Sequence, residues 1–551
     1  MPFPSILDSS TTIRRVDKEK TGVDHNTSTY HQAMVGPSVV HLPDGQTFTV
    51  TPVFAGFFFK SHELTHQHAF PVGWTVVLHT QESLSASAAP EAGSKDKEND
   101  QQDNDDDDLQ PIRPFSRPTL QGDCLFISSI SNPSSSEFAP PASPTRQIAM
   151  MLWVTLYWYF HEPAPSPILP ATALSASTPE AGRPRGEWRI NIKRSGVLRE
   201  KNLLPKLERM GLITTLASSA GPADGDAGWD DMFVTRNAFW QIPGRLFLFT
   251  LAPKPRDGSA GDSRAGTPSG SRPTSPTARS TTSSSMRPQP LVPVSSFPMG
   301  PFHSSAHLPT YYPPAPAQYT TTNGVRHPIR PRPPRQGEVF YSRFVPTAGA
   351  YLSFRVASRE PNPVPYGGPL GPGRGSCRIG AGAAANAHLA SLPDASLLQM
   401  WMAKPRVSAF WGEYTPTFLS AALASRNSFP VVALWDGIPF AYLEIYWLRE
   451  DPVARCLGPG AVDDWDRGVH VFVGEEWARG EVQLWLSSVV HWILAADYRT
   501  MSVCVEPRVD NAKFIRHLQA GGFEKEAELT LPHKQAWFGR LRRQNWEGPS
   551  L

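Results

Sequence analysis

The stretch RGVHVFVGEEWARGEVQLWLSSVVHWILAADYRTMSVCVEP, residues 467–507, decides the fold of the C-terminal part of this chain. Its first eight residues are rich in Val and Phe, which is typical of a strand. Residues 481–496, EVQLWLSSVVHWILAA, have the length and apolar spacing of a long helix. SVCVEP, residues 502–507, predicts a second strand. A strand, a long helix and a strand in this order predict a sheet with helices on its faces.

The segments on both sides extend this pattern. Residues 393–411 predict helices, and residues 429–448 predict two apolar strands that meet at a Trp-Asp-Gly turn. Residues 511–523 predict a helix that ends in Gly-Gly, and residues 534–541 predict a last strand. The expected class is α+β, with a mixed twisted sheet flanked by helices.

The length and composition of the chain predict more than one domain. A chain of 551 residues is too long for one ordinary core. It contains 57 prolines and 41 glycines, which together make up about 18% of the chain. The usual combined share is about 12%. We expect this excess to lie in linkers. We expect a flexible N-terminus at 1–38 and a mixed α/β N-terminal domain at 39–252, with disordered insertions at about 83–120 and 163–185. A Ser/Pro/Arg-rich linker at 253–336 is expected to join it to a C-terminal catalytic domain at 337–546.

Within the N-terminal domain, residues 39–81 predict short strands because β-branched and aromatic residues dominate them. Residues 145–160 predict a buried helix, because they are apolar on nearly every face. A second helix is expected to end at Gly211. This domain shows no cluster of titratable residues, so we expect it to support the C-terminal domain or dimerisation.

Charge and cysteine content exclude several classes of protein. The net charge of +2 favours neither a nucleic-acid binder nor an acidic tail. The four cysteines form no CxxC pair, which argues against a zinc site or a disulfide framework, so we expect no metal and a reducing compartment. The longest apolar run, residues 148–160, is too short to cross a bilayer. We expect a cytoplasmic protein. The final Pro549-Ser550-Leu551 is either an ordinary frayed terminus or a weak peroxisomal address that lacks the basic middle residue.

Several strings resemble a known family. The order of strands and helices is similar to the GNAT acetyltransferase superfamily. The following strings, in this order, resemble hydroxylamine acylases of siderophore pathways: WMxxPRVxxFW from Trp401, PFxYxEIYW from Pro439 with Glu450-Asp451, DRGxHxxxGE from Asp466, EPRVDN from Glu506, and PHK from Pro532. In the N-terminal half, HLPDGQTFTVTPVF, SPTRQIAMMLWVTLYWYFH, GEWRINIKRSGV and KLERMGLI resemble the fungal N5-hydroxyornithine transacylases. The resemblance covers nearly all of the chain that we expect to be ordered.

The resemblance implies an acyl-CoA-dependent N-acyltransferase. Its products would be hydroxamates, the iron-chelating groups of siderophores used in iron acquisition. It implies acyl-CoA as co-substrate, with acetyl and anhydromevalonyl donors both open, and N5-hydroxyornithine as acceptor. It also implies other siderophore-pathway enzymes upstream and downstream. A homo-oligomer is compatible with the sequence, whereas nucleic-acid and membrane partners are not expected.

The coenzyme site implied by the resemblance lies between the fourth and fifth strands of the fold. The backbone of Val471 and Val473 would bind the pantetheine arm. Arg479 and Gly480, before the long helix, would bind the pyrophosphate, although the later glycine of the usual pattern is replaced by Glu481. A plain strand-to-helix turn is the alternative. Asn511 would contact the coenzyme arm, and it also suits the N-cap of the next helix.

We assign the chemistry to His470, because an imidazole on the strand that lines the thioester titrates near working pH. An N-hydroxy amine arrives largely neutral, so the enzyme mainly orients it and removes one proton after attack. Asp510 is the expected partner of His470, and Asp451 is the alternative partner. An ordinary half-buried histidine is the structural alternative for His470. We expect direct transfer in a ternary complex rather than an acyl-enzyme on Cys504.

The remaining candidates concern the acceptor. Asp451, with Glu450, follows an apolar strand and is expected to bind the ornithine ammonium, unless it only forms a solvated turn. Trp411 and Tyr446 are expected to wall the substrate pocket, although core packing also suits aromatic residues. His533 is a second substrate contact.

Two other functions compete with this one. The first is a GNAT-type transferase that acts on another amine. The second is a DNA- or protein-docking factor, based on the linker's ten Lys and Arg against two Asp, and on a helix at 201–213 that suits a winged helix.

Overall fold

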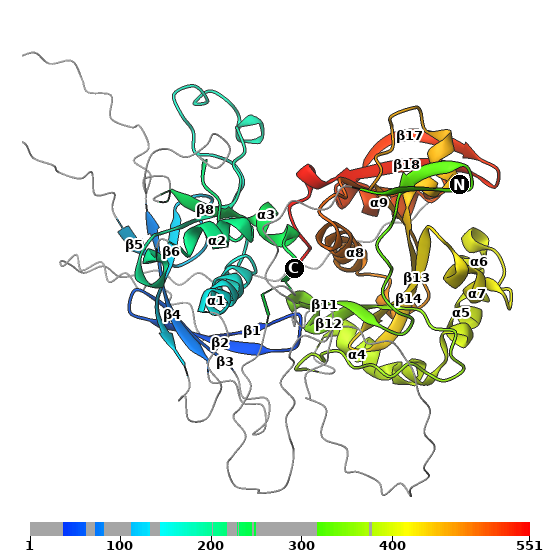
Figure 1. The fold of residues 1–551 in the computed structure, drawn as a ribbon, viewed down its shortest axis with the longest axis horizontal. Helices are drawn as coiled ribbons and strands as arrows, with labels where there is room; N and C mark the ends of the chain where they lie inside the picture. The colour runs from blue at the N-terminus through cyan, green and yellow to red at the C-terminus, as the bar shows by residue number, and fades with distance from the viewer. Residues whose placement is uncertain are drawn as a thin grey trace, which may run out of the picture.

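The computed structural model describes residues 37–61, 72–81, 112–132, 144–200, 202–216, 229, 231–244, 247–248, 317–373 and 377–551. These residues form two halves that lie side by side (Figure 1). The predicted N-terminus at 1–36 and most of the predicted linker, at 253–316, lie outside the described residues.

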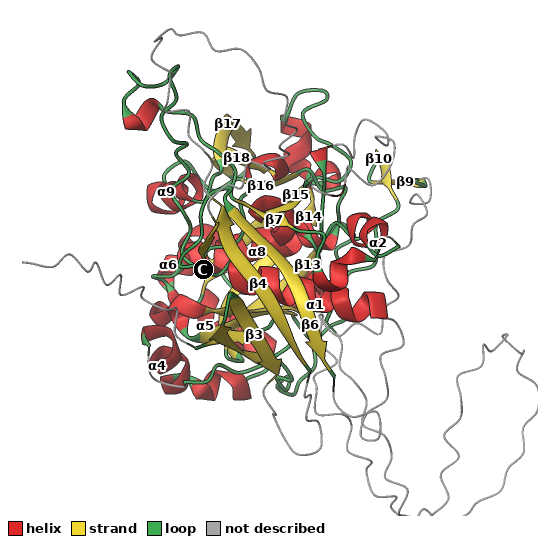
Figure 2. Ribbon diagram, turned by 90° about the vertical axis from the view of Figure 1, so that its left-hand side faces the viewer, coloured by secondary structure: helices red, strands yellow, loops and turns green. Residues whose placement is uncertain are grey.

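The N-terminal half is built on one largely antiparallel sheet with strand order β1-β2-β3-β4-β6-β7-β8, in which β5 also pairs with β4. Figure 2 shows this sheet with β4 and β6 at the front. Its strands are β1 (Ser38–His41), β2 (Thr47–Val53), β3 (Gly56–Ser61), β4 (Gly73–Gln81), β5 (Ile112–Pro114), β6 (Asp123–Ser131), β7 (Arg189–Ile192) and β8 (Met232–Thr235). Its helices are α1 (Pro144–Tyr159), α2 (Leu204–Arg209) and α3 (Arg236–Gln241).

Helix α1 is the centre of the N-terminal core. Every residue from Gln147 to Tyr159 is buried, which confirms the predicted buried helix. One side of α1 packs on the sheet, where Trp158 lies 4.7 Å from the ring of Phe57. Another side packs on α3, where Trp153 lies 5.6 Å from the ring of Phe239. Because both sides are covered, a helix that is apolar all round is stable here.

The C-terminal half contains a second, longer sheet with strand order β11-β12-β13-β14-β15-β16-β18-β17. Its strands are β11 (Val339–Val345), β12 (Ala350–Val356), β13 (Ser428–Trp435), β14 (Ile438–Trp447), β15 (Arg467–Val473), β16 (Ser502–Val505), β17 (Glu524–Leu531) and β18 (Lys534–Arg542). Its helices are α4 (Arg378–Ala385), α5 (Asp394–Met402), α6 (Pro405–Trp411), α7 (Phe418–Ala424), α8 (Val482–Ala496) and α9 (Ala512–Ala520). The predicted α+β fold with its strand, long helix and strand is confirmed, whereas sequence analysis missed β17.

Two turns follow the expected chemistry. The β13–β14 hairpin has Asp436 at φ 45° and Gly437 at φ 82°, the left-handed pair that a two-residue hairpin requires. Helix α2 is followed by Gly211 at φ 76°, which closes it as predicted.

Four segments differ from the expected disorder. Residues 163–185 are ordered, because Leu169 N–H donates to Pro184 O at 2.9 Å and Ile168 forms a bridge with Arg185. The end of the first predicted insertion forms β5, and Phe115 after it is buried. Pro-rich sequence therefore does not prevent order where backbone groups find partners. The C-terminus is also packed rather than frayed, because Ser550 N–H donates to Ser487 Oγ at 2.9 Å.

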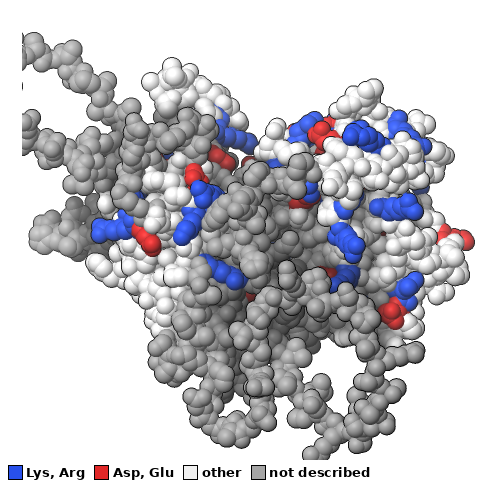
Figure 3. Space-filling model, in the orientation of Figure 1, with Lys and Arg blue, Asp and Glu red and all other residues white. Residues whose placement is uncertain are grey.

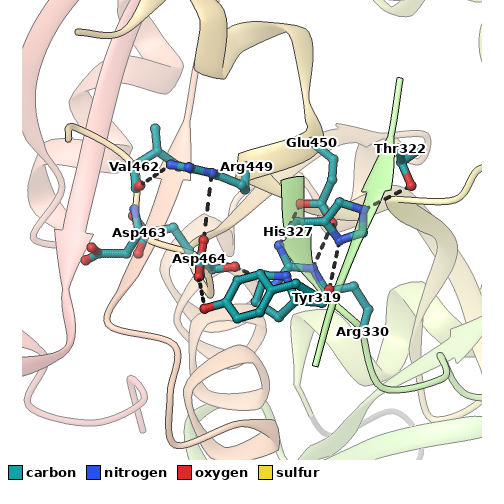
Figure 4. A network of polar contacts seen from close by, with 11 residues as sticks. Tyr319, Thr322, His327, Arg330, Arg449, Glu450, Val462, Asp463 and Asp464 are labelled. Carbon is teal, nitrogen blue, oxygen red and sulfur yellow. Dashed lines mark hydrogen bonds and ion pairs between the residues drawn. The ribbon is translucent and has the colours of Figure 1, made fainter. Parts of the chain in front are cut away.

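The fourth segment is the end of the predicted linker, which forms a hairpin of β9 (Tyr319–Thr322) and β10 (Val325–Pro328) docked on the C-terminal half. Arg330, just after the hairpin, binds both carboxylate oxygens of Glu450 at 2.7 and 2.6 Å (Figure 4). The Nδ1 atom of His327 lies 2.9 Å from the same carboxylate. The guanidinium of Arg330 also lies 4.4 Å from the centre of the Trp447 ring.

The two halves share an interface. Tyr351 of β12 donates to Leu42 O at 3.0 Å, and Arg543 donates to Gln241 at 2.9 Å. The ring of Trp240 on α3 lies 5.6 Å from that of His491 on α8. Figure 3 shows Lys and Arg side chains on both halves of the face drawn, with Asp and Glu scattered among them. Among the described residues, no helix combines the length and apolar character that a membrane span requires.

The ion pair between Arg330 and Glu450 is expected to stabilise the fold. Arg330→Gln leaves a carboxylate that is almost fully buried without its bidentate partner, so the free energy of unfolding is expected to fall by about 3 kcal/mol. Arg332→Gln, at an exposed position of the same segment, is the matched control and should change it by less than about 0.5 kcal/mol. Chemical denaturation measures both variants. Equal stability of the two would show that the ion pair does not anchor the hairpin.

Candidate active site

Strands β15 and β16 pair in parallel over only two residue pairs, Arg467 with Val503 and Gly468 with Cys504. Beyond Gly468 each strand continues without the other. Strand β15 stays paired on its other side, where Val473 lies opposite Ala441 of β14. These are the two strands between which the resemblance places the coenzyme site.

A cavity of about 740 Å³ occupies this separation. It is large enough for a coenzyme arm together with a small substrate. Its walls come from β15, the start of α8, the end of β16, α9, α6 and the loop before β18. The predicted site residues that line it are His470, Val471, Val473, Arg479, Asn511, Trp411, Asp451 and His533.

The other three predicted site residues, Gly480, Tyr446 and Asp510, are not among the described residues that line the cavity. Gly480 packs against the guanidinium of Arg378. Tyr446 is buried beneath His470, with its ring 4.6 Å away. Asp510 is exposed and forms an ion pair with Arg508.

The imidazole of His470 lies between two carboxylates. Its Nε2 atom lies 2.5 Å from Glu506 Oε1, and its Nδ1 atom lies 3.4 Å from Glu444 Oε2. The predicted partners are therefore wrong: Asp510 is held by Arg508, and the Asp451 carboxylate accepts a hydrogen bond from Val453 N at 3.0 Å. The acidic partner of His470 is Glu506.

Glu506 is held from several sides. It is 3% exposed, and its Oε2 accepts a hydrogen bond of 2.7 Å from the Tyr446 hydroxyl. The Nζ atom of Lys534 lies 3.6 Å from Oε1 and donates to the Glu506 backbone oxygen at 2.6 Å. The carboxylate is thus fixed in position by a phenol, an imidazole and an ammonium.

Nearby charges and hydrogen bonds keep His470 and Glu506 oppositely charged. Burial alone would lower the pKa of His470, but the charge of Glu506 and the hydrogen bonds to Glu444 and Glu506 raise it above its ordinary value. Burial would likewise raise the pKa of Glu506, and the charges of His470 and Lys534 lower it instead. At neutral pH the pair is therefore an imidazolium and a carboxylate. This differs from the expected free imidazole.

Gly468 makes this arrangement sterically feasible. It lies opposite Tyr446 in the β14–β15 ladder, and a Cβ atom at Gly468 would overlap the phenol ring. The missing side chain lets the ring cross β15, so that its hydroxyl reaches Glu506.

Glu506 and Glu444 were missed because the sequence does not show strand register. In the parallel ladder Gly468 lies opposite Cys504, so His470 and Glu506 are each two residues further along. Side chains two residues apart share a face of a strand. Had the register been known, this spacing would have predicted the pair.

The coenzyme candidates have their own contacts. The Val473 oxygen already accepts a hydrogen bond of 2.6 Å from Arg406, which lines the cavity from α6. Asn511 caps α9, because its side chain accepts from Phe514 N. Arg479 is half exposed and pairs with Glu476 at 3.2 Å. Lys513 and Arg508 add further positive charge to the cavity wall.

The acceptor candidates also differ in availability. Burial raises the pKa of Asp451, although the hydrogen bond from Val453 and the charge of His470 oppose it. Glu450 is paired with Arg330. It is not one of the described residues that line the cavity. Trp411 packs on Phe472 with ring centroids 5.0 Å apart, so it both lines the cavity and packs in the fold.

Cys504 is fully buried, and burial raises the pKa of its thiol. A thiol of this kind is a poor nucleophile. The described residues contain no group of three side chains arranged to hold a metal ion.

Comparisons with known proteins identify relatives of this chain. The model of the acetyltransferase (GNAT) domain matches residues 391–531, which contain β13 to β17. The chain is 50% identical over 542 residues to the N5-hydroxyornithine acetylase sidL of Beauveria bassiana (strain ARSEF 2860), covering 91% of this chain and 99% of that protein.

Two further relatives match a smaller share of the chain. The N(5)-hydroxyornithine:cis-anhydromevalonyl coenzyme A-N(5)-transacylase SIDF of the same fungus is 32% identical over 51% of this chain and 54% of its own length. The N(6)-hydroxylysine O-acetyltransferase of Escherichia coli is 34% identical over 37% of this chain and 56% of its own length. With half of all residues identical over almost the full length of the first relative, this chain belongs to the hydroxyornithine acyltransferase family and is a GNAT-type acyltransferase.

Proposed function

We propose that this protein transfers the acetyl group of acetyl-CoA to the hydroxylated nitrogen of N5-hydroxyornithine. The observation that carries the proposal is the His470–Glu506 pair at the point where β15 and β16 separate, inside a cavity of about 740 Å³. Acetyl is the proposed donor because the relative with 50% identity is named an acetylase, whereas the anhydromevalonyl transacylase is less similar. The product is a hydroxamate, an iron-chelating group, which supports a place in siderophore biosynthesis.

The coenzyme would lie along β15. Beyond Gly468 this strand has no β16 partner, so alternate residues present backbone groups to the cavity side. Val471 is the proposed contact for the pantetheine arm, and Val473 contributes less because Arg406 occupies its oxygen. Arg479 and Lys513 are the proposed contacts for phosphate groups, because charge-assisted hydrogen bonds hold such anions.

The acceptor would lie between His470 and the loop that carries Asp451. A buried carboxylate with a raised pKa is stabilised when an ammonium group binds to it. Asp451 is therefore the proposed contact for the ornithine α-ammonium group. Trp411 and His533 line the remaining wall and would limit the length of the acceptor.

The reaction requires one proton to leave nitrogen and one to reach sulfur. The nitrogen lone pair forms the C–N bond at the thioester carbon, and the C–S bond breaks with its electron pair on sulfur. The carboxylate of Glu506 takes the proton from nitrogen, and the imidazolium of His470 gives a proton to the thiolate. The pair then has the same net charge as at the start. His470 thus acts mainly as an acid, and Glu506 as the base.

The first prediction concerns the substrates. Purified protein is expected to release free coenzyme A from acetyl-CoA with N5-hydroxyornithine, and far less with ornithine, whose protonated amine is a poor nucleophile. N6-hydroxylysine and a branched C6 acyl-CoA are the comparison acceptor and donor. Faster release with the branched donor would contradict the acetyl assignment. No release with any pair would refute the proposed function.

The second prediction concerns pH. Because the raised pKa of His470 keeps it protonated, kcat at saturating substrates is expected to be flat from about pH 7 to pH 8.5 and to fall only at higher pH, as the imidazolium is lost. His470→Gln should lower kcat about 100-fold across that range. A wild-type kcat that rises tenfold per pH unit would show that a neutral imidazole is the active form.

The third prediction concerns the position of Tyr446. Gly468→Ala places a methyl group where the phenol ring lies, so Tyr446 must move away from Glu506 and His470. We expect kcat to fall about 10–100-fold, with a smaller change in KM for acetyl-CoA. Gly458→Ala, where nothing lies within 4 Å of the added Cβ, is the matched control. Equal activity of the two variants would remove Tyr446 from the positioning of the pair.

A further inference from the structure

Arg343 on β11 is buried between the two halves of the molecule. It is 1% exposed. Its Nε and Nη2 atoms donate to Ser488 Oγ at 3.2 and 2.9 Å. Its Nη1 atom has no hydrogen-bond partner among the described residues. A guanidinium stays protonated in proteins, and the hydrogen bonds of this one to Ser488 go to a neutral hydroxyl, so the site holds a buried positive charge.

A small cavity of about 50 Å³ lies beside this guanidinium. Its walls come from both halves of the molecule. Trp153 and Tyr157 of α1 and Trp240 of α3 belong to the N-terminal half, whereas Arg343 and His491 belong to the C-terminal half. A cavity of this volume has room for one or a few particles of the size of water.

The polar groups of this cavity wall are mostly donors without partners. The indole N–H groups of Trp153 and Trp240 have no acceptor among the described residues. The Tyr157 hydroxyl has no hydrogen-bond partner among them either. An indole N–H and a guanidinium N–H can only donate. Buried donors of this kind are normally satisfied, so a wall with several of them calls for an acceptor inside the cavity.

The neighbouring histidines do not change the charge of this site. Burial, followed by the charge of Arg343, lowers the pKa of His491 to about 3, so this ring is neutral. Burial also lowers the pKa of His161, which is close to Tyr157, to about 3, so this second ring is neutral as well. Asp44 lies on the loop before β2, where its Oδ1 atom accepts a hydrogen bond from Gln46 N at 3.1 Å, and its charge raises the pKa of Tyr157. Tyr341 lies beside His491 with its hydroxyl 2.9 Å from Nδ1.

We propose that the cavity beside Arg343 binds one small inorganic anion, of the size of chloride, that joins the two halves of the protein. The anion accepts hydrogen bonds from the guanidinium and from the unpartnered donors of α1 and α3. It neutralises the buried charge, which a water molecule does not. It also contacts residues of both halves, so its loss is expected to weaken the interface next to α8, the helix whose first turn borders the catalytic cavity.

The first arm of the test is thermal unfolding of the full chain. Sodium chloride is compared with sodium gluconate at equal ionic strength, because gluconate is too large for the cavity. Chloride is expected to raise the midpoint temperature in a saturable way, by about 3 °C at high concentration. Arg343→Met should abolish this dependence, whereas Arg332→Met, at an exposed position, should keep it. A dependence that persists in Arg343→Met would overturn the proposal.

The second arm does not depend on a variant that folds. Crystals of the wild-type protein grown in sodium bromide are measured at the bromine absorption edge. An anomalous peak within contact distance of Arg343 Nη1 is the expected result. Ordered water alone in the cavity, or a side chain of this protein inserted there, would overturn the proposal. Either outcome is independent of acyltransfer activity, so it is separable from the proposed function.

Discussion

Two parallel residue pairs join β15 to β16, and beyond Gly468 the strands separate while each stays paired on its other side. This short contact is the constraint on which the catalytic part depends. It keeps His470 and Glu506 in register, two residues beyond the last paired residues. It also leaves one side of β15 unpaired, so the same strand can carry the imidazole and present backbone groups to a ligand.

The ion pair in this separation changes how the chemistry is understood. A histidine on this strand is most simply taken as a free base, but two carboxylates and a phenol surround it. Low solvent access strengthens the attraction between an imidazolium and a carboxylate, so protonation of His470 is favoured. In the proposed reaction the acid and the base are then two different residues, and Tyr446, which lies over Gly468, helps to position them.

The described residues of the N-terminal half make packing contacts with the C-terminal half and do not line the cavity between β15 and β16. Helix α1 is covered by its own sheet and by α3, and α3 in turn contacts α8. The hairpin at residues 319–328 performs a similar task on the opposite side, because Arg330 anchors it to Glu450, next to Asp451. This hairpin lies in the predicted linker, because its Pro-rich, basic sequence lacks the apolar alternation of a strand.

The sequence by itself determined the order of most strands and helices in the C-terminal half, the buried helix α1, the family, and eight of the residues that line the cavity. These follow from local periodicity, turn residues and strings of matching motifs, which are properties of adjacent residues. Only the tertiary structure decided that Glu506 rather than Asp510 partners His470, that Arg330 occupies Glu450, and that residues 163–185 are ordered. The physical reason is that register, burial and the pKa values they set depend on contacts between residues far apart in the chain.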